Sequence, residues 1–229
     1  MTFSNNRVRA FSWYKAALLV FCTGLIIAAR YYPAGFDWHY TVASALASQK
    51  HNPTGSNWFG GALSLSMLLL WHYVSLLKRE LAAPLPVVAR FSFAALHTGL
   101  ASGAALGLER LFIRDLSDWV YKAHEILGLL TFSGLFIGIL CLLLRAMLRS
   151  RVYALPALLV ISPLVAIGMT QFWLYIEQRD LGWVDTSWRE MGIPTWLSFA
   201  FWQWLAIAIL WMGLALLVLT GSEQNSSRG

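Results

Sequence analysis

The chain has 229 residues, of which 58% are hydrophobic and only 12% are charged, and its mean hydropathy is +0.60. Because a soluble domain carries about 25% charged residues, this composition excludes a soluble globular protein and indicates an integral membrane protein. The net charge of +6 does not indicate a nucleic-acid partner, because the basic excess lies on one side of the predicted membrane.

Six segments are long and apolar enough to cross a bilayer, which takes about 20 residues. They are residues 13–31, 59–77, 86–108, 119–144, 153–176 and 195–219. We therefore predict an all-α, six-helix transmembrane bundle. Residues 1–221 would form a single domain, and residues 222–229 a disordered cytoplasmic tail. The first segment lacks a clear cleavage site, so we interpret it as a membrane anchor and not as a signal peptide.

Charge counting predicts how the bundle is oriented. With the N-terminus inside, the inner connections hold ten of the 17 Lys and Arg residues, and the outer connections hold nine of the 11 acids. The positive-inside rule then favours two cytoplasmic termini, and we expect a bacterial cytoplasmic (inner) membrane. Acidic residues that could do chemistry are therefore concentrated on the outer side.

The connection between the first two spans, residues 31–58, combines polar residues with Trp, Tyr and Phe. A disordered linker avoids aromatic residues, and long loops inside compact domains are usually functional. We predict an ordered lid over the outer mouth of the bundle. Its polar residues that could close a site from above are Asp37, His39, Ser44 and Asn52.

Glycine recurs every fourth residue in the third span, at Gly99, Gly103 and Gly107, and again in the fourth span, at Gly134 and Gly138. Stripes of small residues let the backbones of two helices approach closely within a membrane. We expect the third and fourth spans to form a tight pair.

Ionisable residues inside a span are costly and are functional candidates by default. His124 lies about 9 Å below the outer end of the fourth span, Glu125 is turned about 100° away from it, and Asp118 shares the stripe of Glu125. The same depth counting places three further polar residues in the outer half of the bilayer: Ser102, Gln171 and Gln203. These residues could line one pocket beneath the lid.

The functional hypothesis makes His124 a general base, with Asp37 or Asp118 as the carboxylate that orients it. The remaining candidates would bind the ligand: His39, Ser44, Asn52, Ser102, Glu125, Gln171 and Gln203. The structural alternative is that His124 and Glu125 only form hydrogen bonds to neighbouring helices.

No motif identifies a cofactor. A bis-histidine haem needs two histidines at matched depth. His97 lies about 20 Å from the outer end of its span and His124 about 9 Å, so a bis-histidine haem is disfavoured. A zinc site built from His39, His124 and outer carboxylates is an open alternative, although no HExxH-type spacing supports it. His72 and His97 are more simply interpreted as partners between helices.

The segment FDWHYTVASALASQKHNPTGSNWFGGAL resembles the first outer loop of a bacterial six-span family catalogued as domain of unknown function 998. The elements that carry this resemblance are Asp37, Ser44, Asn52-Pro53 and Trp58-Phe59. The similarity continues through GLERLFIRD and AHEILGLLTF, where the histidine of the family's fourth span matches His124. It covers roughly residues 20–140, and it departs from the family at Ala45-Leu46, where the family often carries an acid.

This family is distantly similar to autophagy-modulator and GPI-lipid-remodelling membrane proteins and has no assigned reaction, so the resemblance implies lipid handling. We expect an outward-facing protein that binds a lipid or another amphiphile, and a further hypothesis is that it acts on lipid headgroups. Membrane lipids are the expected partners. The alternative is a non-catalytic accessory subunit that packs against a larger membrane complex through its glycine stripes. A small-solute transporter is disfavoured, because the chain lacks inverted repeats and paired broken helices.

Overall fold

The computed structural model describes residues 5–33, 35–80, 86–112, 118–178 and 198–218, without the side chains of residues 118–122 and 171–178. The elements follow one another as α1 (Asn5–Arg30), α2 (Ala43–Ala47), α3 (Ser56–Glu80), α4 (Val87–Phe112), α5 (Asp118–Arg149), the 3-10 helix η1 (Arg151–Tyr153), α6 (Ala154–Gln178) and α7 (Phe199–Leu217). The described residues form helices and no strand. Six of the helices are long and apolar enough to cross a membrane, which confirms the predicted all-α bundle.

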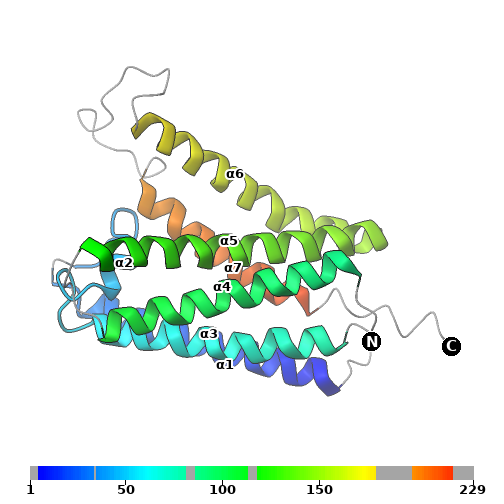
Figure 1. Ribbon diagram of the computed structural model, residues 1–229, viewed down its shortest axis with the longest axis horizontal. Coiled ribbons are helices and arrows are strands. Elements are labelled where there is room, and N and C mark those ends of the chain that lie inside the picture. Colours follow the sequence, from blue (N-terminus) through cyan, green and yellow to red (C-terminus); the bar gives the residue numbers. More distant parts are fainter. Residues whose placement is uncertain (1–4, 34, 81–85, 113–117, 179–197, 219–229) are drawn as a thin grey trace.

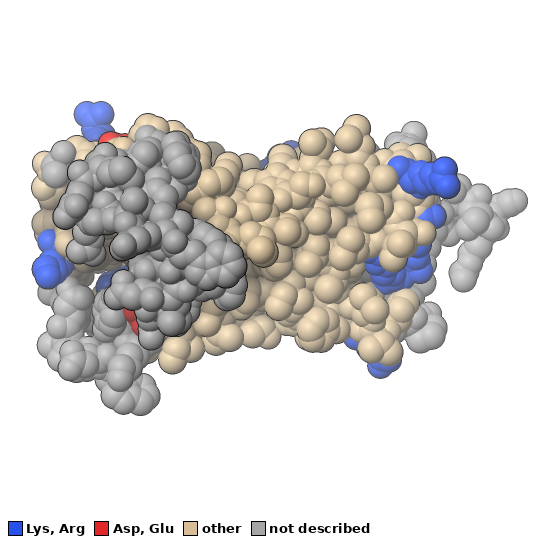
Figure 2. Space-filling model, turned by 90° about the horizontal axis from the view of Figure 1, so that it is seen from above, with Lys and Arg blue, Asp and Glu red and all other residues tan. Residues whose placement is uncertain are grey.

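The helices α1, α3, α4 and α5 lie side by side as antiparallel neighbours, and α7 packs behind them (Figure 1). The helix α6 runs obliquely and diverges from α5 towards the end of the bundle that carries α2 (Figure 1). We call this end the α2 end and the other the opposite end. On the face shown in Figure 2, Lys, Arg, Asp and Glu lie at the two ends and leave an uncharged band between them.

Two buried tyrosines fasten α1 and α3 to α7. The hydroxyl of Tyr14 donates a hydrogen bond to the carbonyl oxygen of Trp211 at 3.0 Å, and the hydroxyl of the fully buried Tyr73 donates to the carbonyl oxygen of Leu214. A buried hydroxyl without a partner would cost about 1–3 kcal/mol. The two bonds therefore favour one arrangement of α7 against the first helices.

The glycine stripes bring helix backbones into contact, as the sequence predicts. A Cβ atom added to Gly134 would lie 2.7 Å from the carbonyl oxygen of Ala95 and 2.7 Å from the backbone nitrogen of Gly99. One added to Gly107 would lie 2.5 Å from the carbonyl oxygen of Gly60. The tight pairing of α4 with α5 is thus confirmed, and the same stripe of α4 also admits α3.

The connection between α1 and α3 is folded around one buried amide. Asn52 is completely buried, and its Nδ2 donates to the carbonyl oxygens of Ala28 at 2.9 Å and Leu46 at 3.1 Å. Its Oδ1 accepts from the backbone N–H of Gly55 at 3.0 Å. One side chain therefore ties the end of α1, the helix α2 and the turn before α3 together.

The same connection is also attached to α7. The indole N–H of Trp204 donates to the carbonyl oxygen of Thr41 at 2.8 Å, and Gln203 Oε1 accepts from the backbone N–H of Ala43 at 2.8 Å. That N–H belongs to the first turn of α2, where helix donors have no partner inside the helix. The segment is therefore an ordered structure that covers the α2 end.

Candidate functional site

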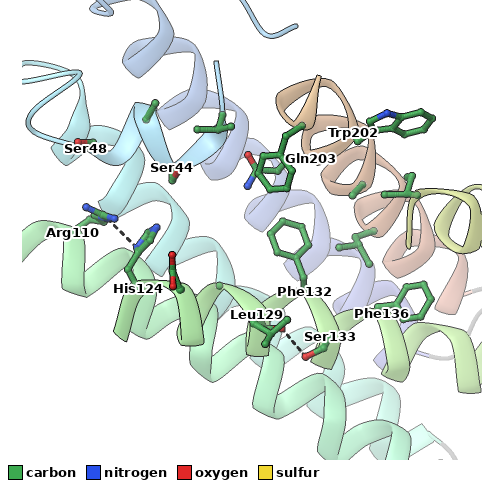
Figure 3. A pocket seen from close by; sticks show the side chains of 18 of the residues that line it. Ser44, Ser48, Arg110, His124, Leu129, Phe132, Ser133, Phe136, Trp202 and Gln203 are labelled. Carbon is green, nitrogen blue, oxygen red and sulfur yellow. Dashed lines mark hydrogen bonds between the residues drawn. The ribbon is translucent and has the colours of Figure 1, made fainter. Parts of the chain in front are cut away.

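A cavity of about 1270 Å³ lies between α5, α6, α7 and the segment that contains α2 (Figure 3). Near the α2 end its lining is mostly polar and includes Ser44, Ser48, Lys50, Arg110, His124 and Glu125. Further along the helices the lining is mostly apolar and includes Leu129, Phe132, Phe136, Ile167 and Leu210, together with Ser133. Along α5 the lining runs from His124 to Phe136, which is about 18 Å by helix rise.

Three charged or ionisable side chains meet at the polar end, where α4 ends beside the start of α5. Arg110 Nε donates to His124 Nδ1 at 3.1 Å, and Glu109 Oε2 lies 3.3 Å from both Arg110 Nε and His124 Nδ1. The Glu109 side chain is only 5% exposed, whereas those of Arg110 and His124 are each 15% exposed. Because the carboxylate is buried against a guanidinium, the pair keeps the net charge of the cluster low.

The two contacts at His124 Nδ1 require different tautomers, because the guanidinium of Arg110 only donates and the carboxylate of Glu109 only accepts. In the neutral tautomer that accepts from Arg110 Nε, which makes the shorter of the two contacts, the ring proton lies on Nε2. No described residue forms a hydrogen bond with Nε2. In this arrangement His124 offers the cavity a donor, which suits an anionic or carbonyl oxygen of a ligand.

Gln203 links the lid to the cavity, and like His124 it has one polar atom already engaged by the protein. Its Oε1 is occupied by the backbone N–H of Ala43, so the amide NH₂ is the group left for a ligand. Ser44, one residue into α2, lines the cavity from the lid side, and Figure 3 shows it opposite His124. The lid thus contributes a hydroxyl to the polar end and is held there by α7.

The structure brings together four of the predicted site residues on the cavity wall: Ser44, His124, Glu125 and Gln203. Four others do not line it: Asp37, His39, Asn52 and Ser102. Ser102 is buried, and both polar ends of the Asn52 amide are engaged with backbone groups. The side chains of Asp118 and Gln171 lie outside the described residues.

Asp37 and His39 pair with each other at the surface. Asp37 Oδ1 accepts from the backbone N–H of His39 at 3.0 Å and lies 2.9 Å from His39 Nδ1. These two contacts, the backbone N–H first, lower the pKa of the Asp37 carboxyl. The described partners of His124 are instead Glu109 and Arg110.

Sequence reasoning missed Glu109 and Arg110 as partners of His124, although one signal pointed to them. They lie three and two residues before the end of α4, and His124 lies six residues into α5. Because a short connection makes consecutive helices antiparallel neighbours, residues at similar distances from that connection face each other. The cavity residues Ser48, Lys50 and His51 follow α2 and carried no such signal.

Two further histidines, His72 and His97, contact neighbouring helices. His97 Nδ1 contacts the carbonyl oxygen of Phe93 at 2.7 Å, and its Nε2 lies 3.2 Å from Ser75 Oγ on α3, as expected for a partner between helices. The ring of His72 packs against Trp13. Within the described residues, no three His, Cys, Asp or Glu side chains gather in a group that could hold a metal ion.

Comparisons of the chain with protein-family models, with curated proteins and with solved structures return no match. The function proposed below therefore depends on the cavity and its chemistry.

Proposed function

We propose that this integral membrane protein binds a lipid or another amphiphile in the cavity at the α2 end. The observation that carries the proposal is the division of one cavity into a polar end and an apolar length beside α5, α6 and α7. Pockets for drug-sized ligands measure about 300–1,000 Å³. A cavity of about 1270 Å³ with this division of polarity suits a headgroup joined to a hydrocarbon chain.

The polar end supplies the groups that a headgroup needs. His124 and the amide of Gln203 offer donors, Lys50 adds a positive charge, and Glu125 adds an acceptor. Any reaction on the headgroup would take place beside His124, where these groups converge. The phenylalanines Phe132 and Phe136 would contact the chain.

Entry from the side is consistent with the position of Leu129. This residue lines the cavity and is 70% exposed, so the cavity wall continues onto a surface that faces the hydrocarbon of a bilayer. A lipid that enters between α5 and α6 would keep its chain in an apolar environment along the whole path. Its headgroup would arrive beneath the lid.

We further propose that the α2 end faces outwards and that both termini are cytoplasmic, in a bacterial inner membrane. The Lys and Arg bias of the connections supports this orientation. The elements around Asp37, Ser44 and Asn52-Pro53 support a place in the six-span family catalogued as domain of unknown function 998.

The test is to fill the cavity without disturbing the fold. Gly128 lines the cavity one turn from His124, and a Cβ added there meets no atom within 4 Å. Gly61 on α3 is equally open but does not line the cavity, so Gly61→Trp is a matched control for Gly128→Trp.

Each purified variant is analysed by native mass spectrometry and by extraction of the lipids that remain bound. We expect Gly128→Trp to lose the amphiphile that wild type and Gly61→Trp retain. Identical bound lipids in all three proteins would refute the proposal. Retention of a second membrane protein, with no change in lipid, would instead support an accessory subunit.

A further inference from the structure

A second, smaller cavity lies at the opposite end, where α1, α3, α4, α5 and α7 converge. It measures about 50 Å³ and is lined by three arginines and one glutamate, Arg7, Arg145, Arg149 and Glu80. The rest of its wall is apolar and includes Leu77, Phe93, Leu142 and Leu217. Three guanidinium groups therefore share a largely apolar recess with a single carboxylate.

The carboxylate of Glu80 forms an ion pair with Arg7. Glu80 Oε2 lies 3.7 Å from Arg7 Nε, and Arg7 is only 7% exposed, so this ion pair is largely shielded from solvent. Arg149 is exposed at the rim. Among the described side chains that line the cavity, positive charge exceeds negative charge by two.

Arg145 is the residue that needs a ligand. Its Nη1 is buried and has no hydrogen-bond partner among the described residues. A guanidinium stays charged, and buried donors of this kind nearly always have a partner. The apolar wall offers none, because Leu142, Phe93 and Leu217 have only hydrocarbon side chains.

The depth of the cavity indicates where the partner comes from. Glu80, Arg149 and Leu217 are the last residues of α3, α5 and α7, and Arg7 is the third residue of α1. The cavity therefore lies where membrane-crossing helices leave the apolar band, at the level of lipid phosphates. Basic pockets between helices at that level bind anionic headgroups.

We infer that this cavity binds the phosphodiester group of an anionic phospholipid, with Arg145 as its principal ligand. A water molecule needs about 10–15 Å³, so about 50 Å³ admits one small group and excludes a whole headgroup. The planar fork of a guanidinium matches the oxygens of a phosphate, and Arg149 adds charge at the rim. The acyl chains would lie outside the bundle. This site is independent of the amphiphile cavity at the α2 end.

The experiment uses the full-length protein in mixed micelles that contain either dioleoylphosphatidylglycerol or dioleoylphosphatidylcholine. The variants are Arg145→Gln and a matched control, Arg90→Gln, which removes an exposed arginine of α4 at the same end. Native mass spectrometry gives the affinity for each lipid, and thermal unfolding gives the stabilisation.

Wild type and Arg90→Gln should bind phosphatidylglycerol more tightly than phosphatidylcholine. Arg145→Gln should weaken phosphatidylglycerol alone, by about ten- to a hundredfold, because it removes hydrogen bonds to a charged group. Arg145→Lys keeps the charge but loses the fork, so its affinity should lie between those of wild type and Arg145→Gln. That comparison also covers the case in which Arg145→Gln does not fold.

An equal loss of affinity for phosphatidylglycerol in Arg145→Gln and Arg90→Gln would show a general attraction to a basic surface. That result would overturn the proposed binding site. Affinity in Arg145→Lys equal to that of wild type would overturn the role of the fork. Stabilisation by inorganic phosphate equal to that by phosphatidylglycerol would overturn the assignment to a lipid.

Discussion

Asn52→Ala should release the lid while leaving the helices intact. Asn52 is completely buried and makes three hydrogen bonds, to the carbonyl oxygens of Ala28 and Leu46 and to the N–H of Gly55. A buried hydrogen bond contributes about 0.5–1.5 kcal/mol net, so the loss of three should cost about 3 kcal/mol. A local opening that becomes easier by about 3 kcal/mol is populated about a hundredfold more.

The assay is hydrogen–deuterium exchange of the backbone amides between residues 43 and 56. The backbone N–H of Asn52 donates to the carbonyl oxygen of Ser48 at 2.7 Å, and the backbone N–H of Ser56 donates to the carbonyl oxygen of Asn52 at 2.9 Å. The exchange of both backbone amides therefore reports on the lid. In Asn52→Ala these amides should exchange about a hundredfold faster, whereas those in the middle of α3 and α4 should keep their rates.

The matched control is Asn57→Ala. Asn57 accepts one exposed hydrogen bond from Gln49 at 3.3 Å, so its removal should change lid exchange by less than about threefold. The reasoning is refuted if Asn52→Ala leaves the lid amides as slow as in wild type. It is also refuted if exchange rises equally in every helix, because Asn52 would then support the whole bundle and not the lid.

Three further changes test the packing, the cluster and the lid. Gly134→Ala should lower the free energy of unfolding by about 1–3 kcal/mol, because its Cβ would lie 2.7 Å from backbone atoms of α4. Gly61→Ala, whose Cβ meets no atom within 4 Å, should leave the free energy of unfolding unchanged, and thermal unfolding compares the two variants. Glu109→Gln should destabilise the protein by about 2 kcal/mol in the same assay, because it removes the buried carboxylate charge that contacts Arg110 Nε and His124 Nδ1. Hydrogen bonds from His39 lower the pKa of Asp37, so the stability that they add is present at neutral pH and is lost as pH falls through that lowered pKa. After correction for the intrinsic pH dependence of amide exchange, the protection of residues 38–41 should therefore fall only in acid, and it should stay constant in Asp37→Asn.

The spans could be predicted because a bilayer demands about 20 apolar residues from every helix that crosses it. The exact residues at which the helices begin and end could not be predicted. The first helix begins at Asn5, eight residues before the predicted span, because polar residues extend a helix beyond the apolar band. Pairing through Gly99 and Gly134 was predictable, since small residues repeated every fourth position form one smooth face.

The partners of the candidate residues were harder to predict, because depth along a helix does not say which way a side chain points. Counting placed His124, Ser102 and Gln203 at similar depths, yet only His124 and Gln203 line the cavity. In the lid, Asp37 bonds to His39, two residues away, because a short acidic side chain readily closes a local turn. Such local bonds compete with the long-range pairing that the hypothesis for His124 required.

The most direct measurement is photocrosslinking with a phospholipid that carries a diazirine in the middle of one acyl chain. The protein is irradiated in nanodiscs, digested and analysed by mass spectrometry, with and without excess unlabelled lipid. We expect saturable adducts on the cavity residues Phe132, Phe136 and Trp202, and their loss in Gly128→Trp. Adducts confined to exposed residues such as Leu19 and Ile26 of α1, with no competition, would contradict a bound amphiphile.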